Sequence, residues 1–299
     1  MSVLSLVGAC LWLVCGCQGT GPAATPPPAT AQPILDPAPA TTSRVTPSRA
    51  PTARPTPTAK PRRPLVALDP GHGGEDLGAR HFDLNGQMDF HESTINLQLA
   101  QRIGNKLKAQ GYRVFYTRDG DYLPNRAQKD LNGDGELTPH DDLLLRVDLV
   151  NRARADLLLS LHQNAWEHPD DELVRATGGT TTYYCPDRTF ADRNLRFANL
   201  VHAEVLATVR RFGHEPTDRG VLPDHSLAAP GDAARHLMIL GPVDRVIKRA
   251  SQMPGVLSEP LFITCDVEAA LMVREDFQEA LADAYVRAIV AYFAEQESP

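Results

Sequence analysis

The sequence predicts an α/β fold: a single domain with a mostly parallel, twisted central sheet flanked by helices on both faces. Three short apolar runs, at residues 65–68, 156–161 and 256–264, have the length and composition of buried strands. Stretches with helical spacing of apolar residues separate these runs along the chain. Because strands that alternate with helices pair through helical crossovers, this succession favours a parallel sheet.

A proline-rich segment at residues 18–63 precedes this domain. It holds about half of the chain's 25 prolines, and Thr, Ala and Ser fill most of the remainder. Such a composition buries too little apolar surface to offset the entropy lost on ordering, so a disordered, semi-extended linker is expected. The folded domain then spans residues 64–299, which is long enough for one large core.

Charge divides at the same boundary. The linker is basic, whereas the whole chain has a formal net charge of −7, so the domain itself is strongly acidic. An acidic domain argues against nucleic acid as a partner, because nucleic acid is bound by basic faces. The linker is expected either to lie against an anionic surface, such as lipid headgroups or wall polymer, or to act as a solvated spacer.

The first 17 residues form an apolar run that is too short to span a bilayer, which is typical of a secretory signal. No Lys or Arg precedes the run, which departs from the usual pattern. The Val14-Cys15-Gly16-Cys17 stretch resembles a bacterial lipoprotein signal, which predicts cleavage before Cys17 and a lipid anchor on that residue. Cys10 lies in a similar local setting but would leave a very short apolar region, and plain secretion is the alternative.

The first strand ends at a turn made of small residues. Asp69 and Pro70 stop the strand, since proline has no N–H for the sheet, and the glycines at 71, 73 and 74 allow a tight bend. His72 is therefore expected at the tip of a strand. A surface histidine on an ordinary turn would look the same at this stage.

An amphipathic helix is predicted over residues 93–110, where apolar residues recur every fourth position before Gly111. Glu92 stands at its start, where the helix dipole favours a carboxylate whether or not it has another role. Residues 112–117 then read as the second strand.

An oxygen-rich insert follows at residues 130–141. Asp130, Asn132 and Asp134 stand at alternate positions, Gly135 permits a sharp turn, and Asp141 occupies the twelfth position. This spacing predicts a calcium loop, with the backbone carbonyl of Glu136 as a further ligand, and resembles the loops of dockerin modules. A solvated Asn-Gly/Asp-Gly turn is the alternative.

The remaining elements place two more polar side chains at strand ends. A helix at 143–153 precedes the strand at 156–161, which ends at His162. A β-prone run at 180–185, a helix at 191–212 and a last helix at 277–293 are also predicted, whereas 214–252 is weakly patterned apart from an apolar run at 237–240. Glu259 is the polar residue within the run at 256–264.

His72, Glu92 and His162 together provide two imidazoles and one carboxylate, the ligand set of hydrolytic zinc sites that leave a fourth position to water. Glu259 adds a carboxylate on a neighbouring strand, where burial without a partner is costly. The carboxyl ends of parallel strands are where such sites assemble.

At these residues the chain resembles the zinc-dependent N-acetylmuramoyl-L-alanine amidases of the Amidase_3 type. The resemblance spans about residues 65–295, although each motif alone is weak. The matching stretches are Leu68-Asp69-Pro70-Gly71-His72-Gly73-Gly74, Glu92 with Asn96-Leu97, Thr117-Arg118, Ser160-Leu161-His162-Gln163-Asn164-Ala165, and Met253-Pro254-Gly255-Val256-Leu257-Ser258-Glu259.

The resemblance implies zinc ligands at His72, Glu92 and His162, a general base at Glu259, and peptidoglycan as the substrate, outside the cytoplasm. Pro260-Leu261-Phe262 replaces the Gly-Phe pair usual after this glutamate, and the calcium-like insert and residues 214–252 are additions. Two alternatives stay open: a non-catalytic peptidoglycan-binding lipoprotein and a zinc peptidase.

The other cysteines and histidines of the domain are given no role. Two cysteines far apart in sequence make neither a disulfide framework nor a Cys-type zinc site, so Cys185 and Cys265 are expected to be small buried hydrophobic residues. The histidines without a motif are His81, His91, His140, His168, His202, His214, His225 and His236.

Overall fold

The fold is seen in a computed structural model that describes residues 62–227 and 235–296. The predicted signal peptide, Cys17 and the linker up to residue 61 lie outside the described residues. Over the part of the chain that is described, no helix has both the length and the apolar character needed to cross a bilayer.

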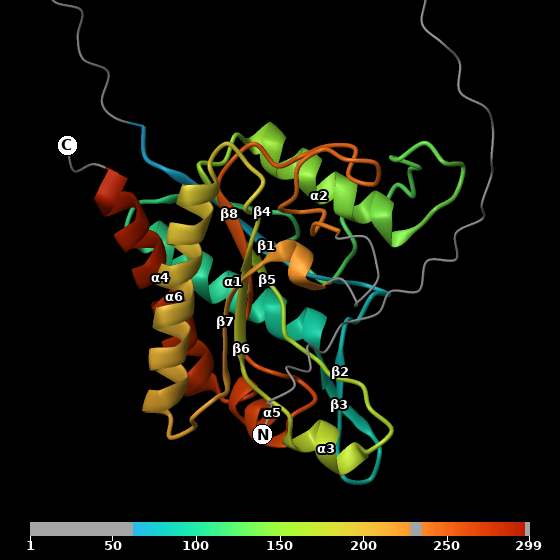
Figure 1. Ribbon diagram of the computed structural model, residues 1–299, viewed down its shortest axis with the longest axis vertical. Helices are drawn as coiled ribbons and strands as arrows, with labels where there is room; N and C mark the ends of the chain where they lie inside the picture. The colour runs from blue at the N-terminus through green and yellow to red at the C-terminus, as the bar shows by residue number, and fades with distance from the viewer. Residues whose placement is uncertain (1–61, 228–234, 297–299) are drawn as a thin grey trace, which may run out of the picture. The chain divides into compact units, whose positions relative to one another are not determined.

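The helices and strands alternate along the chain, as expected for an α/β domain (Figure 1). In chain order they are β1 (Leu65–Pro70), β2 (Arg80–Phe82), β3 (Met88–His91), α1 (Glu92–Ala109), β4 (Arg113–Tyr116), α2 (Pro139–Ala153), β5 (Leu157–Leu161), α3 (Asp171–Ala176), β6 (Thr180–Tyr184), α4 (Ala191–Arg211), β7 (Asp218–Pro223), the short 3-10 helix η1 (Asp224–Leu227), β8 (Gly255–Glu259), α5 (Asp266–Met272) and α6 (Glu275–Gln296).

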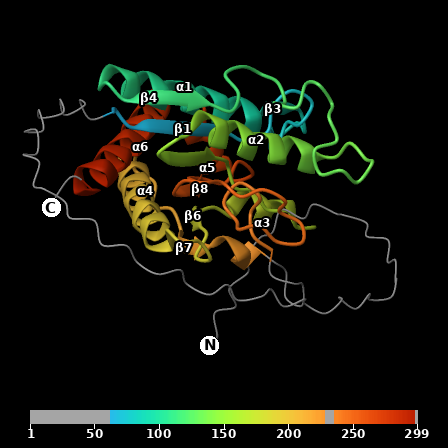
Figure 2. The same ribbon diagram turned by 90° about the horizontal axis from the view of Figure 1, so that it is seen from above.

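Within the described residues, six strands form one sheet in the order β4-β1-β5-β8-β6-β7. Figure 2 shows this order running from β4 at the top to β7 at the bottom. The predicted parallel pairing is confirmed for β4, β1, β5 and β8, whereas β6 is antiparallel to β8 and parallel to β7. The carboxyl ends of β6 and β7 therefore lie at the opposite edge of the sheet from those of β1, β5 and β8.

Helices cover both faces of the sheet, as predicted. Along β1, Val66 and Leu68 pack into one apolar cluster with residues of α1, α4 and α6, and Figures 1 and 2 both show α4 beside α6. Leu65 and Ala67 point the other way, into a second cluster with α2 and with Ile239, Leu240 and Met253. Alternate side chains of one buried strand thus serve two cores.

Several elements differ from the sequence-based expectation. The polar loop after β1 contains the β2–β3 hairpin, and the weakly patterned region contains β7, whose residues are all exposed or half-buried and so lack an apolar signal. Helix α2 begins at Pro139 rather than 143, because proline suits the first helical position and the Asp141 carboxylate accepts from Thr138 N–H at 2.9 Å. Strand β8 stops at Glu259 rather than 264, since Pro260 cannot donate to the sheet.

Candidate metal centre and active site

Three adjacent strand ends and one helix start bring the predicted ligands together. Gly71 N–H donates to the Leu161 carbonyl at 3.0 Å, and His162 N–H donates to the Ser258 carbonyl at 3.0 Å. These bonds hold the ends of β1, β5 and β8 side by side, so that His72, His162 and Glu259 follow one another along the sheet edge. Glu92 reaches the same place as the first residue of α1.

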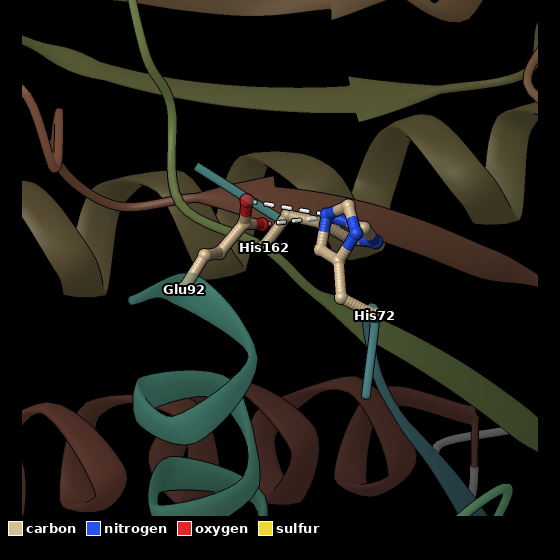
Figure 3. A group of neighbouring side chains, drawn as sticks. All are labelled: His72, Glu92 and His162. Atoms are coloured by element: carbon tan, nitrogen blue, oxygen red, sulfur yellow. Dashed lines mark hydrogen bonds and ion pairs between the residues drawn. The ribbon is translucent and has the colours of Figure 1, made fainter. Parts of the chain in front are cut away.

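The Glu92 carboxylate contacts both imidazoles from one side (Figure 3). Its Oε2 is 3.1 Å from His72 Nε2 and its Oε1 is 3.0 Å from His162 Nδ1. Two donor atoms on a tetrahedral zinc ion, each about 2.0–2.2 Å from the metal, lie roughly 3.4 Å apart. The three side chains therefore fit a zinc ion after a small spreading of the donors.

Glu92 is oriented by backbone and side-chain donors. Gln163 N–H and Asn96 Nδ2 donate to Oε1 at 2.9 and 3.2 Å, and Ala79 N–H donates to Oε2 at 2.9 Å. Burial acts to raise the pKa of Glu92, but the two imidazoles hold it well below the ordinary value. The carboxylate is thus kept charged and aimed at the site.

His72 is held by a second carboxylate. Its Nδ1 is 2.8 Å from Asp76 Oδ2, which leaves Nε2 to face the site. Burial opposes a charge on this ring, yet the Glu92 charge and the Asp76 hydrogen bond outweigh it and raise the pKa of His72 to about 10. The pocket therefore favours a cation, and a metal ion would have to displace that proton.

The backbone of His72 is strained and is clamped by two buried arginines. Its φ of 62° lies in the left-handed region, which costs a non-glycine residue of the order of 1–3 kcal/mol unless the surroundings impose it. Arg146 donates to the His72 carbonyl at 2.7 Å and to the Pro70 carbonyl at 2.9 Å, and Arg118 donates to the Gly71 carbonyl at 2.9 Å. Carbonyls along the turn are thereby fixed.

Arg146 is itself paired with two carboxylates. It lies 2.9 Å from Asp69 and 2.7 Å from Asp142, and all three residues are buried. Asp69 also accepts from the hydroxyls of Thr117 and Ser160 at 2.5 and 2.8 Å. This network ties α2 to the ends of β1, β4 and β5.

Two glycines make room for the ligands. A Cβ on Gly71 would lie 2.2 Å from the His162 ring, and a Cβ on Gly78 would lie 2.6 Å from both Glu92 Oε2 and His72 Cδ2. Any side chain at either position would displace a ligand, so the close backbone approach expected of the glycine-rich turn is seen at Gly71.

Glu259 ends β8 beside the predicted metal ligands. Burial and the Glu92 charge raise the pKa of Glu259 to about 8, and Arg219 and His72 partly offset them. The hydrogen bonds of the described residues include none to this carboxylate. A half-buried acid without a hydrogen-bond partner is poised to exchange a proton with a water or substrate that enters the site.

The unusual Pro260-Leu261-Phe262 stretch does not disturb the site. Leu261 O accepts from Asn164 N–H at 2.9 Å and Ile263 N–H donates to Asn164 O at 2.8 Å, so the chain after β8 stays beside the chain after β5. Phe262 N–H also donates to the buried Glu268 carboxylate at 2.6 Å. The segment is therefore pinned beyond the end of the strand.

The calcium-like insert has its carboxylates engaged within the loop. Asp130 accepts from Gly133 and Gly135 N–H, Asp134 accepts from Glu136 N–H and the Asn132 amide, and Asp141 accepts from Leu131 and Thr138 N–H. Among the described residues, the acidic and histidine groups that converge within 4.8 Å do not include Asp130, Asp134 or Asp141. Calcium binding here stays a prediction.

Sequence reasoning missed the residues that orient the ligands. Asp76, Asn96 and Gln163 contact His72 or Glu92 or support those contacts, and Arg146 clamps the turn. No sequence signal marked Arg146, because its burial on α2 is seen only in the structure. Asp76 lies four residues after His72 in a loop, where no periodicity marks it.

The chain is similar to known proteins over most of its length. Residues 66–291 match the family described as Amidase_3, N-acetylmuramoyl-L-alanine amidase. The N-acetylmuramoyl-L-alanine amidase AmiC of Neisseria meningitidis serogroup B is 26% identical over 249 residues, which cover 77% of this chain and 53% of that protein. The chain therefore spans about half the length of this relative.

A second relative and a solved structure cover the domain more evenly. The germination-specific N-acetylmuramoyl-L-alanine amidase of Bacillus subtilis is 29% identical over 235 residues, covering 79% of this chain and 82% of that protein. The CwlD amidase of Clostridioides difficile, solved in complex with the GerS lipoprotein, has the same fold, with a TM-score of 0.58 at 21% identity over 78% of this chain and all of that one. The family match extends over most of the described domain, and the chain belongs to the Amidase_3 family of N-acetylmuramoyl-L-alanine amidases.

Proposed function

We propose that this chain is a zinc-dependent hydrolase that cleaves the amide bond between N-acetylmuramic acid and the L-alanine of the peptidoglycan stem peptide. The observation that carries the proposal is the convergence of His72, Glu92 and His162, with Glu259 at the next strand end. Membership of the amidase family supports the substrate.

His72, Glu92 and His162 would hold the zinc ion. When bound, zinc supplies a Lewis acid that polarises the scissile carbonyl and makes water more acidic. Asp76 keeps the Nε2 of His72 turned toward the site, and Gln163 and Ala79 N–H do the same for Glu92. The partial exposure of the two histidine side chains, 13% and 21%, leaves an approach for substrate.

Glu259 would act as the general base. Its carboxylate accepts a proton from the attacking water and later delivers it to the nitrogen of the departing L-alanyl amine. The raised pKa of Glu259 suits both steps, because a group that titrates near neutral pH can accept and release a proton with little driving force lost.

Digestion of purified peptidoglycan by the zinc-loaded full chain, with mass analysis of the products, tests the proposal. We expect stem peptides with a free L-alanine amino terminus and glycans that keep an intact lactyl group. Cleavage within the stem peptide would favour a zinc peptidase. Binding of zinc and peptidoglycan without release of stem peptide would favour a non-catalytic binding protein.

His162→Ala is the matching control for the role of zinc. Loss of one imidazole leaves two protein ligands, so the site should lose both its metal and its hydrolytic activity. Elemental analysis and the same digestion assay read the two effects separately. Full hydrolysis by a variant that no longer holds zinc in this site would contradict the assignment.

We also propose that the chain is exported and anchored to the envelope membrane through lipid on Cys17. The support is the sequence alone, namely the apolar run that ends at Gly16-Cys17 and the basic linker behind it. Cells fed a fatty-acid probe should label the wild type and leave Cys17→Ala unlabelled. Equal labelling of both would exclude Cys17 as the anchor.

A further inference from the structure

A second group of metal-binding side chains lies away from the site described above. Cys185 follows β6, Asp224 follows β7, and His236 lies in the segment that leads towards β8. One ligand atom from each lies within 4.8 Å of the other two. These residues are far apart in sequence, so the parallel pairing of β6 with β7 is what brings Cys185 and Asp224 together.

The three groups face a single point. Cys185 Sγ is 3.4 Å from His236 Nδ1, and the same nitrogen is 2.8 Å from Asp224 Oδ1. Leu237 N–H donates to Asp224 Oδ2 at 3.2 Å, while Oδ1 faces the histidine. A zinc ion with bonds of about 2.3 Å to sulfur and about 2.0 Å to nitrogen places these two atoms roughly 3.5 Å apart. The spacing of Sγ and Nδ1 agrees with that geometry.

Two of the three donors are withdrawn from solvent. Cys185 and Asp224 each have 0% of their surface exposed, and the His236 side chain is 13% exposed. A buried carboxylate and a buried thiol are costly unless they are paired, and a bound cation would pair them.

In both His236 and His72, a carboxylate contacts the ring nitrogen that points away from the proposed metal. The Nε2 of His236 is 3.3 Å from Asp187 Oδ2, just as the Nδ1 of His72 is 2.8 Å from Asp76 Oδ2. A carboxylate on the far nitrogen of a histidine fixes the ring and makes the near nitrogen a better metal ligand. The His225 ring makes a T-shaped contact with the His236 ring, with centroids 5.6 Å apart. His225 offers a further nitrogen near His236 and Asp187.

We propose that Cys185, Asp224 and His236 form a second, structural metal site for a divalent ion of the zinc class. Thiolate and imidazole together select zinc over magnesium or calcium, which prefer oxygen ligands. The reaction at the site is an exchange: the metal would bind the Cys185 thiolate, and the thiol proton would leave to solvent, while His236 would bind through Nδ1 as a neutral imidazole with its proton on Nε2, beside Asp187.

The site is structural because of where it lies. Strand β6 is antiparallel to β8, and Tyr184 pairs with Val256 while Thr181 pairs with Glu259. Cys185 is therefore at the opposite edge of the sheet from Glu259, about 13 Å away at the usual rise per residue. An ion here would join the ends of β6 and β7 to the segment that supplies Ile239, Leu240 and Met253 to the second core cluster.

The test counts metal ions and asks whether sulfur binds one. The full chain is prepared with Cys10, Cys15 and Cys17 replaced by Ala, so that Cys185 and Cys265 are the remaining cysteines. We expect about two equivalents of zinc, and replacement by Co²⁺ should give a thiolate-to-cobalt charge-transfer band. The His72 centre has no sulfur ligand and cannot produce that band.

Two variants and one control complete the test. Cys185→Ala should lose one equivalent and the band, whereas Cys265→Ala, which removes the other buried cysteine, should keep both. His162→Ala should lose the other equivalent and keep the band, and it needs no change at the second site. A single equivalent in the parent chain, a band that survives Cys185→Ala, or no metal in His162→Ala would each overturn the proposal.

Discussion

The two edges of the central sheet carry similar side chains with different access to solvent. At the carboxyl ends of β1 and β5, the His72 and His162 side chains are 13% and 21% exposed. At the carboxyl ends of β6 and β7, Cys185 and Asp224 are fully buried. Open coordination is what catalysis requires and closed coordination is what a structural metal site requires. His236 is 13% exposed, as His72 is, so the two edges differ in one donor: the partly exposed His162 on one side and the buried Cys185 on the other.

Glu259→Gln should have the largest effect on activity, and it should change only the edge of the sheet that carries His72, His162 and Glu259. The amide keeps the size of the side chain but cannot accept the proton, so hydrolysis should fall by ~10²–10⁴-fold while zinc content stays unchanged. Peptidoglycan digestion and elemental analysis measure the two quantities. Wild-type hydrolysis by this variant would show that Glu259 is not the base.

Arg146→Met tests how much the buried ion pairs of Arg146, which hold the turn around His72, contribute to the stability of the fold. The substitution leaves Asp69 and Asp142 buried without their partner, and breaking a buried ion pair in this way costs about 3–5 kcal/mol of unfolding free energy. Urea unfolding of both proteins gives the difference.

Arg152→Met is the matched control, since Arg152 is exposed on the same helix, and a change within about 0.5 kcal/mol is expected. Equal stabilities of the two variants would mean that the clamp contributes little.

Asp76→Asn and Asp187→Asn test the contact between a carboxylate and a histidine ring, with His72 at one edge of the sheet and with His236 at the other. Each removes the carboxylate charge behind one histidine, which typically costs 10–100-fold in metal affinity. Chelator competition should show weaker zinc binding in both, but only Asp76→Asn should slow peptidoglycan hydrolysis. A loss of hydrolysis in Asp187→Asn would show that the two edges are coupled.

The calcium-like insert belongs to neither edge and should give the smallest effect. If it binds Ca²⁺, the ion stabilises the native state by about 1.4 kcal/mol when present at ten times its Kd. Millimolar Ca²⁺ should then raise the Tm of the wild type and not that of Asp134→Ala. The same change in Tm for both proteins would show that the loop is held by its own hydrogen bonds and does not bind Ca²⁺.

The sequence predicted the His72 edge because local signals mark it. An apolar run that stops at Asp69-Pro70, and a similar run that stops at His162, identify strand ends without knowledge of the fold. Glu92 is marked by the start of an amphipathic helix, and the predicted ligand set converges in the structure.

The other edge has no such signals. Cys185, Asp224 and His236 gather through a strand, β7, whose residues alternate too weakly to be recognised, and all histidines outside the motifs looked alike. The pairing of Arg146 with Asp69 is likewise a property of burial, because each residue alone resembles a surface charge. Such contacts join residues that are distant in sequence, and the spacing of apolar residues along the chain gives no information about them.

The reversed direction of β6 has a practical consequence. Because β6 and β7 point away from the edge that carries His72, the segments that follow them lie away from the proposed catalytic groups. Substitutions in residues 185–188 and 236–253 are then expected to change thermal stability without changing the proposed activity. Changes that aim to prolong the lifetime of the proposed amidase would begin at that edge and leave the glycine-rich turn untouched.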